Sequence, residues 1–249
     1  MTSNHFFVPK ACFDGTRAVL RGAESRHFGR VLRGRPGDEI WLFDEDGARF
    51  RARVEAVAGG EEVVCAVLER VGPSDIGPRI ILGQAVLKTK TMDEVVEKAA
   101  EFGAAAVAPV VTARTVIRLA AGAGQRSARW SRIAREAAKQ SRTGRPPVIE
   151  PVRRLEPFLR RRAEEVKIVL GERAEGRLRD VLAEISSKRS GRPPESAVLL
   201  VGPEGGWTDE EEARIAGAGF VPASLGRTVL RAETAATAVL AVVIHAWTE

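Results

Sequence analysis

The sequence predicts an α/β protein in which a larger domain with a mostly parallel sheet follows a small β-barrel-like domain. Short strand patterns separated by tight turns fill the first 72 residues, whereas apolar runs alternate with helical patterns from residue 79 onward. Between them, GPSDIGP at 72–78 has the Gly, Pro, Ser and Asp content of a linker. A chain of 249 residues can form two domains. We therefore expect domains at 1–73 and 74–249.

The first domain is predicted to contain short strands and one helix. Strand patterns occur in HFFVP, TRAVLRG, DEIWLFDEDGARFRARVEAV and EEVVCAVLERV. The third of these stretches predicts a hairpin, because the Asp46–Gly47 pair between its two apolar halves is a strong turn signal. The stretch ESRHFGRVLR instead predicts a short helix with basic residues at Arg26, Arg30 and Arg33.

Strands and helices alternate in the second domain. Strand patterns occur in IILGQAVL, AAAVAPVV, PVIEPV, VKIVLGE, AVLLVGPE and FVPASLG. Two helices are predicted to open with a capping box, a Thr followed three residues later by Glu, and to end at a glycine. The residues concerned are Thr91, Glu94 and Gly103 for the first helix, and Thr208, Glu211 and Gly219 for the second. The stretch RSARWSRIAREAAKQS is another helix, and the last helix is expected at 234–247.

Positive charge is concentrated in one part of the chain. The net charge is +6, yet residues 1–73 hold 11 basic and 11 acidic residues, whereas residues 114–162 hold 14 basic and 3 acidic residues. This excess predicts a face that binds a polyanion, and nucleic acid is favoured over the alternative of a solvated, arginine-rich surface.

The helix at 126–140 contributes to this charge with one face only. Its basic residues are spaced by three or four, so they share a face that could follow a phosphate backbone. These basic residues are Arg129, Arg132, Arg135 and Lys139. The opposite face is apolar and is expected to pack on the core. Its residues are Trp130, Ile133, Ala134 and Ala137.

Several classes of protein are not expected. No apolar segment is long enough to cross a bilayer, and the N-terminal stretch MTSNHFFVPK lacks the pattern of a secretion signal. Cys12 and Cys65 are too few and too far apart for a disulfide framework or a metal site. We therefore expect a cytoplasmic protein with reduced thiols, no metal and no membrane partner.

The stretch GPEGG, residues 202–206, lies between a strand pattern and a helix signal, where phosphate-binding loops occur. It fits neither the P-loop nor the dinucleotide fingerprint, and the chain has no Gly-x-Ser-x-Gly nucleophile motif. Two further segments, SLG at 224–226 and LRAET at 230–234, also follow strand patterns. Each glycine taken singly is explained by a turn, but together the three segments predict a ligand site at the carboxyl edge of the sheet.

The chain resembles the bacterial RsmE family, the 16S ribosomal RNA uridine N3-methyltransferases of the SPOUT superfamily. The resemblance runs nearly from end to end. Its blocks are HFFVP, HFGRVLRGRPGDEIWLFDEDG, LKTKTMDEVVEKAAEFG, RWSRIAREAAKQSRTGRPPVI, LLVGPEGGWTDEE and SLGRTVLRAETAATAVL. The chain departs from the family at His5, where Arg is frequent, and at Trp207, where Phe is usual.

The resemblance implies a PUA-like RNA-binding barrel over 1–73 and a SPOUT methyltransferase domain with a C-terminal trefoil knot over 74–249. It also implies a homodimer, with cofactor sites near the subunit interface, and S-adenosylmethionine as the cofactor. Glycines would let the main chain approach this cofactor closely, and leucines would flank its adenine. The residues assigned to the cofactor are Leu170, Leu200, Gly202, Glu204, Gly205, Gly206, Ser224, Leu225, Gly226 and Leu230.

Methylation of uridine N3 removes a proton and leaves negative charge on the uracil, so it needs a proton acceptor and a group that stabilises the anion. Arg231 and Glu233 are the candidates, since both belong to the LRAET segment. If that segment is extended, their side chains point the same way. Arg231 would stabilise the anion or hold a phosphate, and Glu233 would accept the proton or orient Arg231. The alternative is an ion pair that caps the following helix.

The expected partner is 16S ribosomal RNA or the small ribosomal subunit. The residues expected to contact RNA are Arg26, Arg30, Arg33, Arg114, Arg129, Arg132, Arg135, Lys139, Gln140, Arg142 and Arg145. Gln140 and Arg142 are also candidates to reach the cofactor pocket. Two other functions stay open. One is a knotted methyltransferase with another RNA target, such as a ribose 2′-hydroxyl, and the other is an RNA-binding assembly factor without activity.

Overall fold

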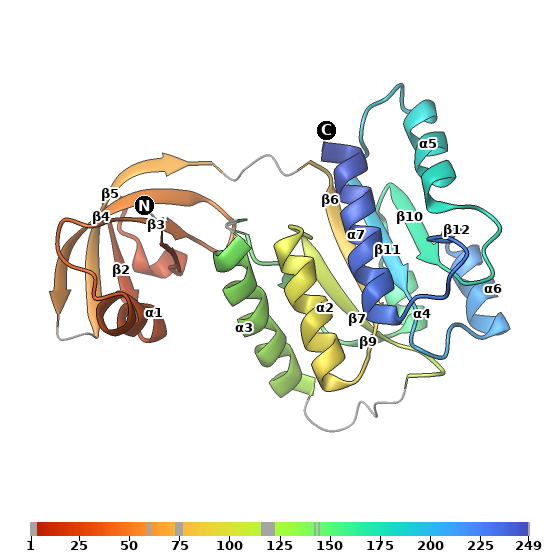
Figure 1. Cartoon of the computed structure of the whole chain (residues 1–249), viewed down its shortest axis with the longest axis horizontal. Coiled ribbons are helices and arrows are strands. Elements are labelled where there is room, and N and C mark those ends of the chain that lie inside the picture. The colour runs from red at the N-terminus through yellow and green to blue at the C-terminus, as the bar shows by residue number, and fades with distance from the viewer. Residues whose placement is uncertain are drawn as a thin grey trace. The chain divides into compact units, whose positions relative to one another are not determined.

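The computed structural model divides into two compact units (Figure 1). One unit comprises Met1–Asp75 with Arg135–Pro146, and the other comprises Ile76–Ala134 with Pro147–Glu249. The residues that the structure describes are 4–58, 61–72, 77–115, 123–141, 143 and 145–248. The short segment 135–146 therefore packs with the first unit, although it lies beyond the linker in the sequence.

The first unit is built on a five-stranded sheet with the order β1-β3-β4-β5-β2. Its strands are β1 (His5–Phe7), β2 (Arg17–Arg21), β3 (Glu39–Phe43), β4 (Arg49–Ala58) and β5 (Glu62–Val71). The pair β1 and β3 is parallel and the other pairs are antiparallel. A 3-10 turn, η1 (Lys10–Cys12), precedes β2, and a short helix, α1 (Ala23–Arg26), continues as a π-helical turn, η2 (His27–Val31). The predicted strands and the predicted short helix are confirmed.

The β3–β4 hairpin forms at the predicted Asp46–Gly47 turn. Gly47 has a φ of 78°, which favours glycine, and the Asp44 carboxylate accepts hydrogen bonds from the N–H groups of Asp46 and Ala48 at 2.9 and 3.0 Å. The inward-facing side chains of the sheet then enclose an apolar core. Among its members are Phe6, Leu20, Phe28, Ile40, Leu42, Val54 and Val63.

The second unit contains a seven-stranded sheet in which all strand pairs are parallel, as predicted. The order is β12-β10-β11-β6-β7-β8. Strand β9 also pairs with β7, at a later part of that strand than β8. The strands are β6 (Arg79–Ala85), β7 (Ala106–Val111), β8 (Val148–Ile149), β9 (Arg153–Arg154), β10 (Val166–Leu170), β11 (Ser196–Val201) and β12 (Val221–Ala223). Since β10, β11 and β12 are neighbours, the loops that follow them meet at one edge of the sheet.

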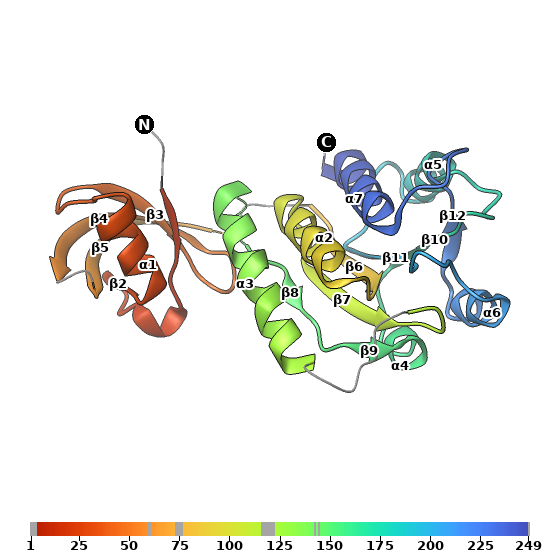
Figure 2. The ribbon, with the colours of Figure 1, turned by 60° about the horizontal axis from the view of Figure 1, so that its bottom comes forward.

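Helices cover both faces of this sheet. They are α2 (Thr89–Glu101), α4 (Leu155–Leu159), α5 (Leu178–Lys188), α6 (Asp209–Gly217) and α7 (Ala232–Thr248). A further helix, α3 (Ala123–Ser141), begins in this unit, and its residues from Arg135 onward belong to the first unit. Helices α2 and α7 pack together on one face, and α4 and α6 lie on the other (Figure 2). The trefoil knot implied by the family resemblance stays a prediction.

The helix ends follow their capping chemistry, with one prediction wrong. The capping box of Thr208 and Glu211 at the start of α6 is confirmed, and Gly219 follows the helix with a φ of 83°. Helix α2, however, begins at Thr89 and has no side-chain cap, so the predicted box at Thr91 does not form. The reason is that the N–H of Met92 already bonds the carbonyl of Lys88, so helical hydrogen bonding starts before Thr91.

Helices α4 and α5 were not predicted, because neither carries a start signal. The residue before α5, Arg177, makes no side-chain cap, and α4 is a short helix with Pro157 in its first turn. A proline is tolerated there because the N–H groups of the first turn have no partner within the helix.

Close packing on the α4 face depends on one glycine in β6. A Cβ added to Gly83 would lie 2.7 Å from the Phe158 ring and 3.1 Å from a methyl carbon of Leu200. Phe158 and Leu200 are both buried in the cluster between the sheet and helices α4 and α6. The absence of a side chain at Gly83 therefore lets α4 approach the strand.

Gly83→Ala is expected to lower the free energy of unfolding by about 1–3 kcal/mol, because the new methyl group would overpack this layer. Gly217→Ala is the matched control, since an added Cβ meets nothing within 4 Å there. It should leave stability unchanged or raise it by up to about 1 kcal/mol, because Gly disfavours helix. Urea denaturation of both variants measures the difference, and equal effects would contradict the packing argument.

Candidate functional site

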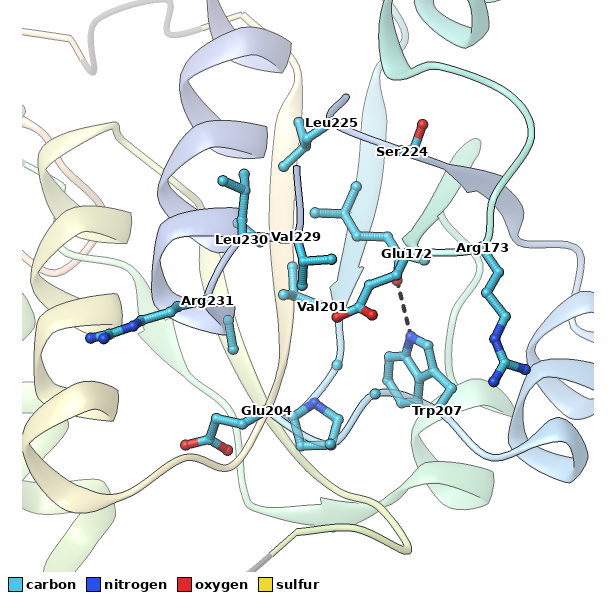
Figure 3. Close-up of a pocket in the computed structure, with 18 of the residues that line it drawn as sticks. Glu172, Arg173, Val201, Glu204, Trp207, Ser224, Leu225, Val229, Leu230 and Arg231 are labelled. Carbon is cyan, nitrogen blue, oxygen red and sulfur yellow. Dashed lines mark hydrogen bonds between the residues drawn. The ribbon is translucent and has the colours of Figure 1, made fainter. Parts of the chain in front are cut away.

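A cavity of about 390 Å³ opens at the carboxyl ends of β10, β11 and β12 (Figure 3). The loops 170–173, 201–207 and 223–231 line it, together with the first turn of α7. The predicted ligand position at this edge of the sheet therefore coincides with a cavity. The volume is within the range of small-molecule sites, about 300–1,000 Å³.

Most residues that the sequence assigned to a cofactor line this cavity. They are Leu170, Gly202, Glu204, Gly205, Gly206, Ser224, Leu225, Gly226 and Leu230. Arg231 and Arg114, which were assigned to catalysis and to RNA, also line it. The three segments that the sequence analysis connected are thus brought together by the fold.

Leu200 is the exception. It is fully buried in the core cluster under α4 and α6, and its neighbour Val201 lines the cavity instead. Successive side chains of a strand point to opposite faces, so only one of the two can reach the cavity. Because β11 is apolar on both faces, its sequence does not reveal which one.

Sequence reasoning missed Glu172, although it is the second residue after β10 and lies at the cavity edge. In Figure 3 its carboxylate points into the cavity, whereas the neighbouring Arg173 points away from it. Arg173 is 82% exposed and makes a long ion pair with Asp209, at 3.5 Å. The signal that could have revealed Glu172 is its place after a parallel strand, where ligands are bound.

The glycine loop, the stretch GPEGG at 202–206 that follows β11, is held in shape by the side chain of Trp207. The Trp207 indole N–H donates to the carbonyl of Leu170 at 3.0 Å, which joins the ends of β11 and β10 (Figure 3). Gly202 lies against the same ring, since an added Cβ would be 3.1 Å from it. Gly206 has a φ of 69° and closes a turn by donating its N–H to the carbonyl of Pro203. A side chain at Gly202 would require the indole ring to shift, and the left-handed φ of Gly206 favours glycine.

Two side chains from other strands also contact this loop. The buried amide of Gln84, at the end of β6, donates to the carbonyl of Ala85 at 3.0 Å and lies 3.4 Å from that of Gly202. From the loop after β7, the Arg114 guanidinium donates to the carbonyls of Gly205 and Trp207, at 2.6 and 3.2 Å. Arg114 therefore contacts the protein's own main chain.

Arg231 and Glu233 do not lie side by side in an extended segment. Arg231 directly precedes α7, and its carbonyl accepts a hydrogen bond from the N–H of Ala235, while Glu233 is already in the first helical turn. Residues two apart on a helix face different sides. Accordingly Arg231 lines the cavity, whereas Glu233 is not among its lining residues. The carboxylates that line it are those of Glu172, Glu204 and Glu212.

The basic face of α3 is engaged with the protein over much of its length. The Arg129 guanidinium donates to the Asp93 carboxylate at 2.6 Å, and the Arg135 guanidinium lies 5.5 Å from the centre of the Phe7 ring. Lys139 is paired with Glu24. Arg132 is exposed. On the other face, Trp130, Ala134 and Ala137 are buried as predicted, whereas Ile133 is only half-buried.

Lys139 and Glu24 form an ion pair inside the first unit. Their side chains are 14% and 16% exposed, and the Lys139 ammonium lies 2.7 Å from Glu24 and 2.8 Å from Glu136. Burial raises the pKa of Glu24, an effect that Lys139 opposes. One carboxylate oxygen of Glu24 is buried without a hydrogen-bond partner in the described part of the chain. Lys139 therefore neutralises a buried charge.

The other residues assigned to RNA are at the surface, except for one that is not among the residues the structure describes. Exposed residues are Arg26, Arg30, Arg33, Gln140 and Arg145. The stem of Arg145 packs on the hairpin turn, where a Cβ on Gly47 would lie 2.8 Å from it. Arg142 lies outside the described residues.

Neither a metal site nor a membrane span is found in the described residues. They contain no group of three or more His, Cys, Asp or Glu residues that could hold a metal ion. Nor does any described helix combine the length and apolar character required to span a bilayer. Burial raises the pKa of the Cys65 thiol to about 12, so this thiol stays protonated at neutral pH.

Both units match families of known proteins. An RNA methyltransferase domain matches residues 75–244, and an RNA methyltransferase PUA domain matches residues 20–68. Ribosomal RNA small subunit methyltransferase E of Mycobacterium bovis is 34% identical over 249 residues, which covers 98% of this chain and 92% of that protein. The chain belongs to the RsmE family.

Other RsmE proteins and solved structures agree with this assignment. The Bacillus subtilis RsmE is 30% identical and covers 87% of this chain and 85% of its own length. A crystal structure of Neisseria gonorrhoeae RsmE bound to S-adenosyl methionine has a TM-score of 0.85, 30% identity and 98% coverage of each chain. A Legionella pneumophila methyltransferase in complex with the same cofactor has a TM-score of 0.84, 29% identity and 99% coverage of each chain. The fold is therefore a SPOUT methyltransferase domain with a PUA-like domain.

Trp207→Phe tests the support of the glycine loop in this RsmE protein. Phenylalanine keeps a ring beside Gly202 but lacks the N–H, so the Leu170 carbonyl loses its indole donor. We expect the free energy of unfolding to fall by about 1–3 kcal/mol, the cost of an unpaired buried polar group. Chemical denaturation measures this difference. A variant as stable as the wild type would show that the indole hydrogen bond does not support the loop.

Proposed function

We propose that this protein methylates N3 of a specific uridine in 16S ribosomal RNA of the small ribosomal subunit, with S-adenosylmethionine as the cofactor. The observation that carries the proposal is the cavity at the carboxyl edge of the parallel sheet, which the glycine loop, the SLG segment and Arg231 line together. Membership of the RsmE family and the cofactor-bound structures of similar proteins support it.

The residues of the cavity fit this cofactor. When bound, S-adenosylmethionine supplies a methyl group carried on a sulfonium. The side chains of Val201, Leu225 and Leu230 offer apolar contact for an adenine, and the adjoining glycines leave main-chain groups accessible at close range. The Glu172 carboxylate points into the cavity, where it would accept hydrogen bonds and favour a positively charged ligand (Figure 3).

Arg231 is the residue that we assign to the uracil. Arg231 is exposed and is one of the residues that line the cavity, and in Figure 3 its side chain points outward from the cavity edge. A guanidinium at this edge can stabilise the negative charge that forms when N3 of a bound uridine loses its proton. Glu233 remains a candidate to accept that proton or to orient Arg231. Glu204 is a second candidate for the acceptor, because it is exposed and lines the same cavity.

We further propose that the protein acts in the cytoplasm as a homodimer with a trefoil knot in its second unit. Exposed apolar side chains support a subunit interface near the cavity. Val229 in its wall is 73% exposed, and Val242 on α7 is 41% exposed. Such residues would be covered by a second copy of the chain.

Nucleoside mass spectrometry tests the proposed reaction. Small-subunit RNA from cells that lack the gene should gain 3-methyluridine on incubation with the purified protein and S-adenosylmethionine. Formation of a 2′-O-methylated nucleoside would instead assign the protein to another target. Absence of any methylation together with absence of cofactor binding would support the assembly-factor alternative.

The same assay separates the candidate catalytic residues. Arg231→Ala should lower turnover by at least about a hundredfold while cofactor affinity falls less, since its charge acts mainly on the transition state. If Glu204 accepts the proton, Glu204→Gln should lower turnover by about 10²–10⁴-fold and Glu233→Gln by much less. The reverse order would assign the proton to Glu233. Wild-type turnover in Arg231→Ala would contradict its catalytic role.

RNA binding should depend on Arg132 and not on Lys139. Arg132→Ala should make the slope of log affinity against log salt shallower by about 0.7–0.9, as for one phosphate contact, and leave stability nearly unchanged. Lys139→Met should instead destabilise the fold by about 3–5 kcal/mol, because the buried Glu24 loses its partner. Salt titrations of RNA binding and urea denaturation measure both effects. An unchanged slope for Arg132→Ala would mean that this arginine is only a solvated surface charge.

A further inference from the structure

The turn that follows β7 is held by hydrogen bonds of its own, in addition to its contacts with the glycine loop. Within the turn, the Thr115 hydroxyl accepts the N–H of Thr112 at 3.0 Å and lies 2.9 Å from the Thr112 hydroxyl. The N–H of Thr115 donates back to the carbonyl of Thr112 at 3.2 Å. Arg114 is therefore presented by a closed turn and not by an open loop.

The buried carboxylate of Glu211 ties this turn to the start of α6. One oxygen accepts the N–H of Ala113 at 2.7 Å, and the other accepts the N–H of Thr208 at 3.1 Å as part of the capping box. Glu211 is only 5% exposed. Charge-assisted hydrogen bonds of this kind are strong, so the two segments keep a fixed separation.

Arg114 extends from this fixed turn to the glycine loop. One nitrogen of its guanidinium, Nη1, donates to the carbonyls of both Gly205 and Trp207. Its stem packs beside Gly205, where an added Cβ would lie 3.3 Å from Cδ and 3.4 Å from Cβ of Arg114. The two carbonyls lie on either side of Gly206, whose φ of 69° is the left-handed conformation of the loop.

Holding both carbonyls fixes the Gly205–Gly206 and Trp207–Thr208 peptide planes. The N–H groups that share planes with these carbonyls are those of Gly206 and Thr208, which donate to the Pro203 carbonyl and to the Glu211 carboxylate. The Gly206–Trp207 peptide between them is therefore held from both sides. The loop faces the cavity, and it presents its main chain there. The charge of Arg114 is thus used on the protein's own backbone, although sequence position alone placed it among the RNA contacts.

We propose that Arg114 is a positioning residue that sets the shape of the glycine loop, and through it the affinity for S-adenosylmethionine, and that it does not neutralise an RNA phosphate. The proposal rests on the proposed function, because it takes the cavity as the cofactor site. Measurement of S-adenosylmethionine binding by the wild-type protein tests whether the protein binds this cofactor. The variants of Arg114 then test only the positioning role of this residue.

Arg114→Met is the decisive variant, because it keeps an unbranched apolar stem beside Gly205 and removes the donor. Calorimetric affinity for S-adenosylmethionine should fall about tenfold, which corresponds to the loss of about 1.4 kcal/mol. Hydrogen exchange in the ligand-free protein should become faster at the amide of Gly206, since the loop loses its support. The salt slope of RNA binding should stay that of the wild type.

Two further variants complete the experiment. Arg114→Lys keeps the positive charge but lacks the planar fork of the guanidinium, so it should retain the RNA affinity and restore little of the cofactor affinity. Arg214→Met is the matched control. Arg214 lies on α6 and is paired with Glu156 at the surface, so its replacement should change neither quantity.

Wild-type cofactor affinity and wild-type exchange at Gly206 in Arg114→Met would overturn the proposal. A salt slope shallower by about 0.7–0.9 with cofactor affinity intact would also overturn it, and would return Arg114 to the RNA contacts. Full recovery of cofactor affinity by Arg114→Lys would show that charge and not geometry matters, which is equally against a positioning role.

Discussion

The Trp207 side chain, through its hydrogen bond to the Leu170 carbonyl and its contact with Gly202, is the constraint on which the candidate site depends in this chain. It joins the ends of two neighbouring parallel strands, which a main-chain ladder no longer connects once the strands have ended. Because the indole ring occupies the space beside Gly202, this position tolerates no side chain without movement of the ring. Glycine at position 202 thus fits the aromatic side chain that follows the loop, whereas Gly206 is favoured by its own left-handed φ of 69°.

The cations of this chain show that a basic sequence pattern is weak support for a binding surface. Arg129, Arg135 and Lys139 share a helix face as their spacing requires, yet each has a partner within the protein. Arg114 likewise contacts main-chain carbonyls. Spacing shows which side chains share a face, but only the structure shows which cations already have a partner within the protein.

Much of the architecture could be predicted because it depends on local signals. Apolar runs that alternate with helical patterns predicted the parallel sheet. Asp46–Gly47 predicted the hairpin, and Thr208 with Glu211 predicted the start of α6. The incorrect and missing predictions of site residues have physical causes. Buried strands carry no alternation, so Leu200 could not be told from Val201. The place of Glu172 at the end of a strand pattern does not distinguish it from Arg173, because only the tertiary structure shows which of the two side chains points into the cavity.

The first unit is discontinuous in the sequence, and this has a consequence for how the chain folds as it is synthesised. Glu24 lies in the part of the unit that is made first, whereas its partner Lys139 belongs to the segment made last. At about 5–20 residues per second, the ribosome delivers that segment on the order of ten seconds after the linker. Until then the Glu24 carboxylate of the nascent first unit has no Lys139 with which to pair. Completion of the first unit is therefore coupled to synthesis of residues Ile76–Ala134 of the second unit.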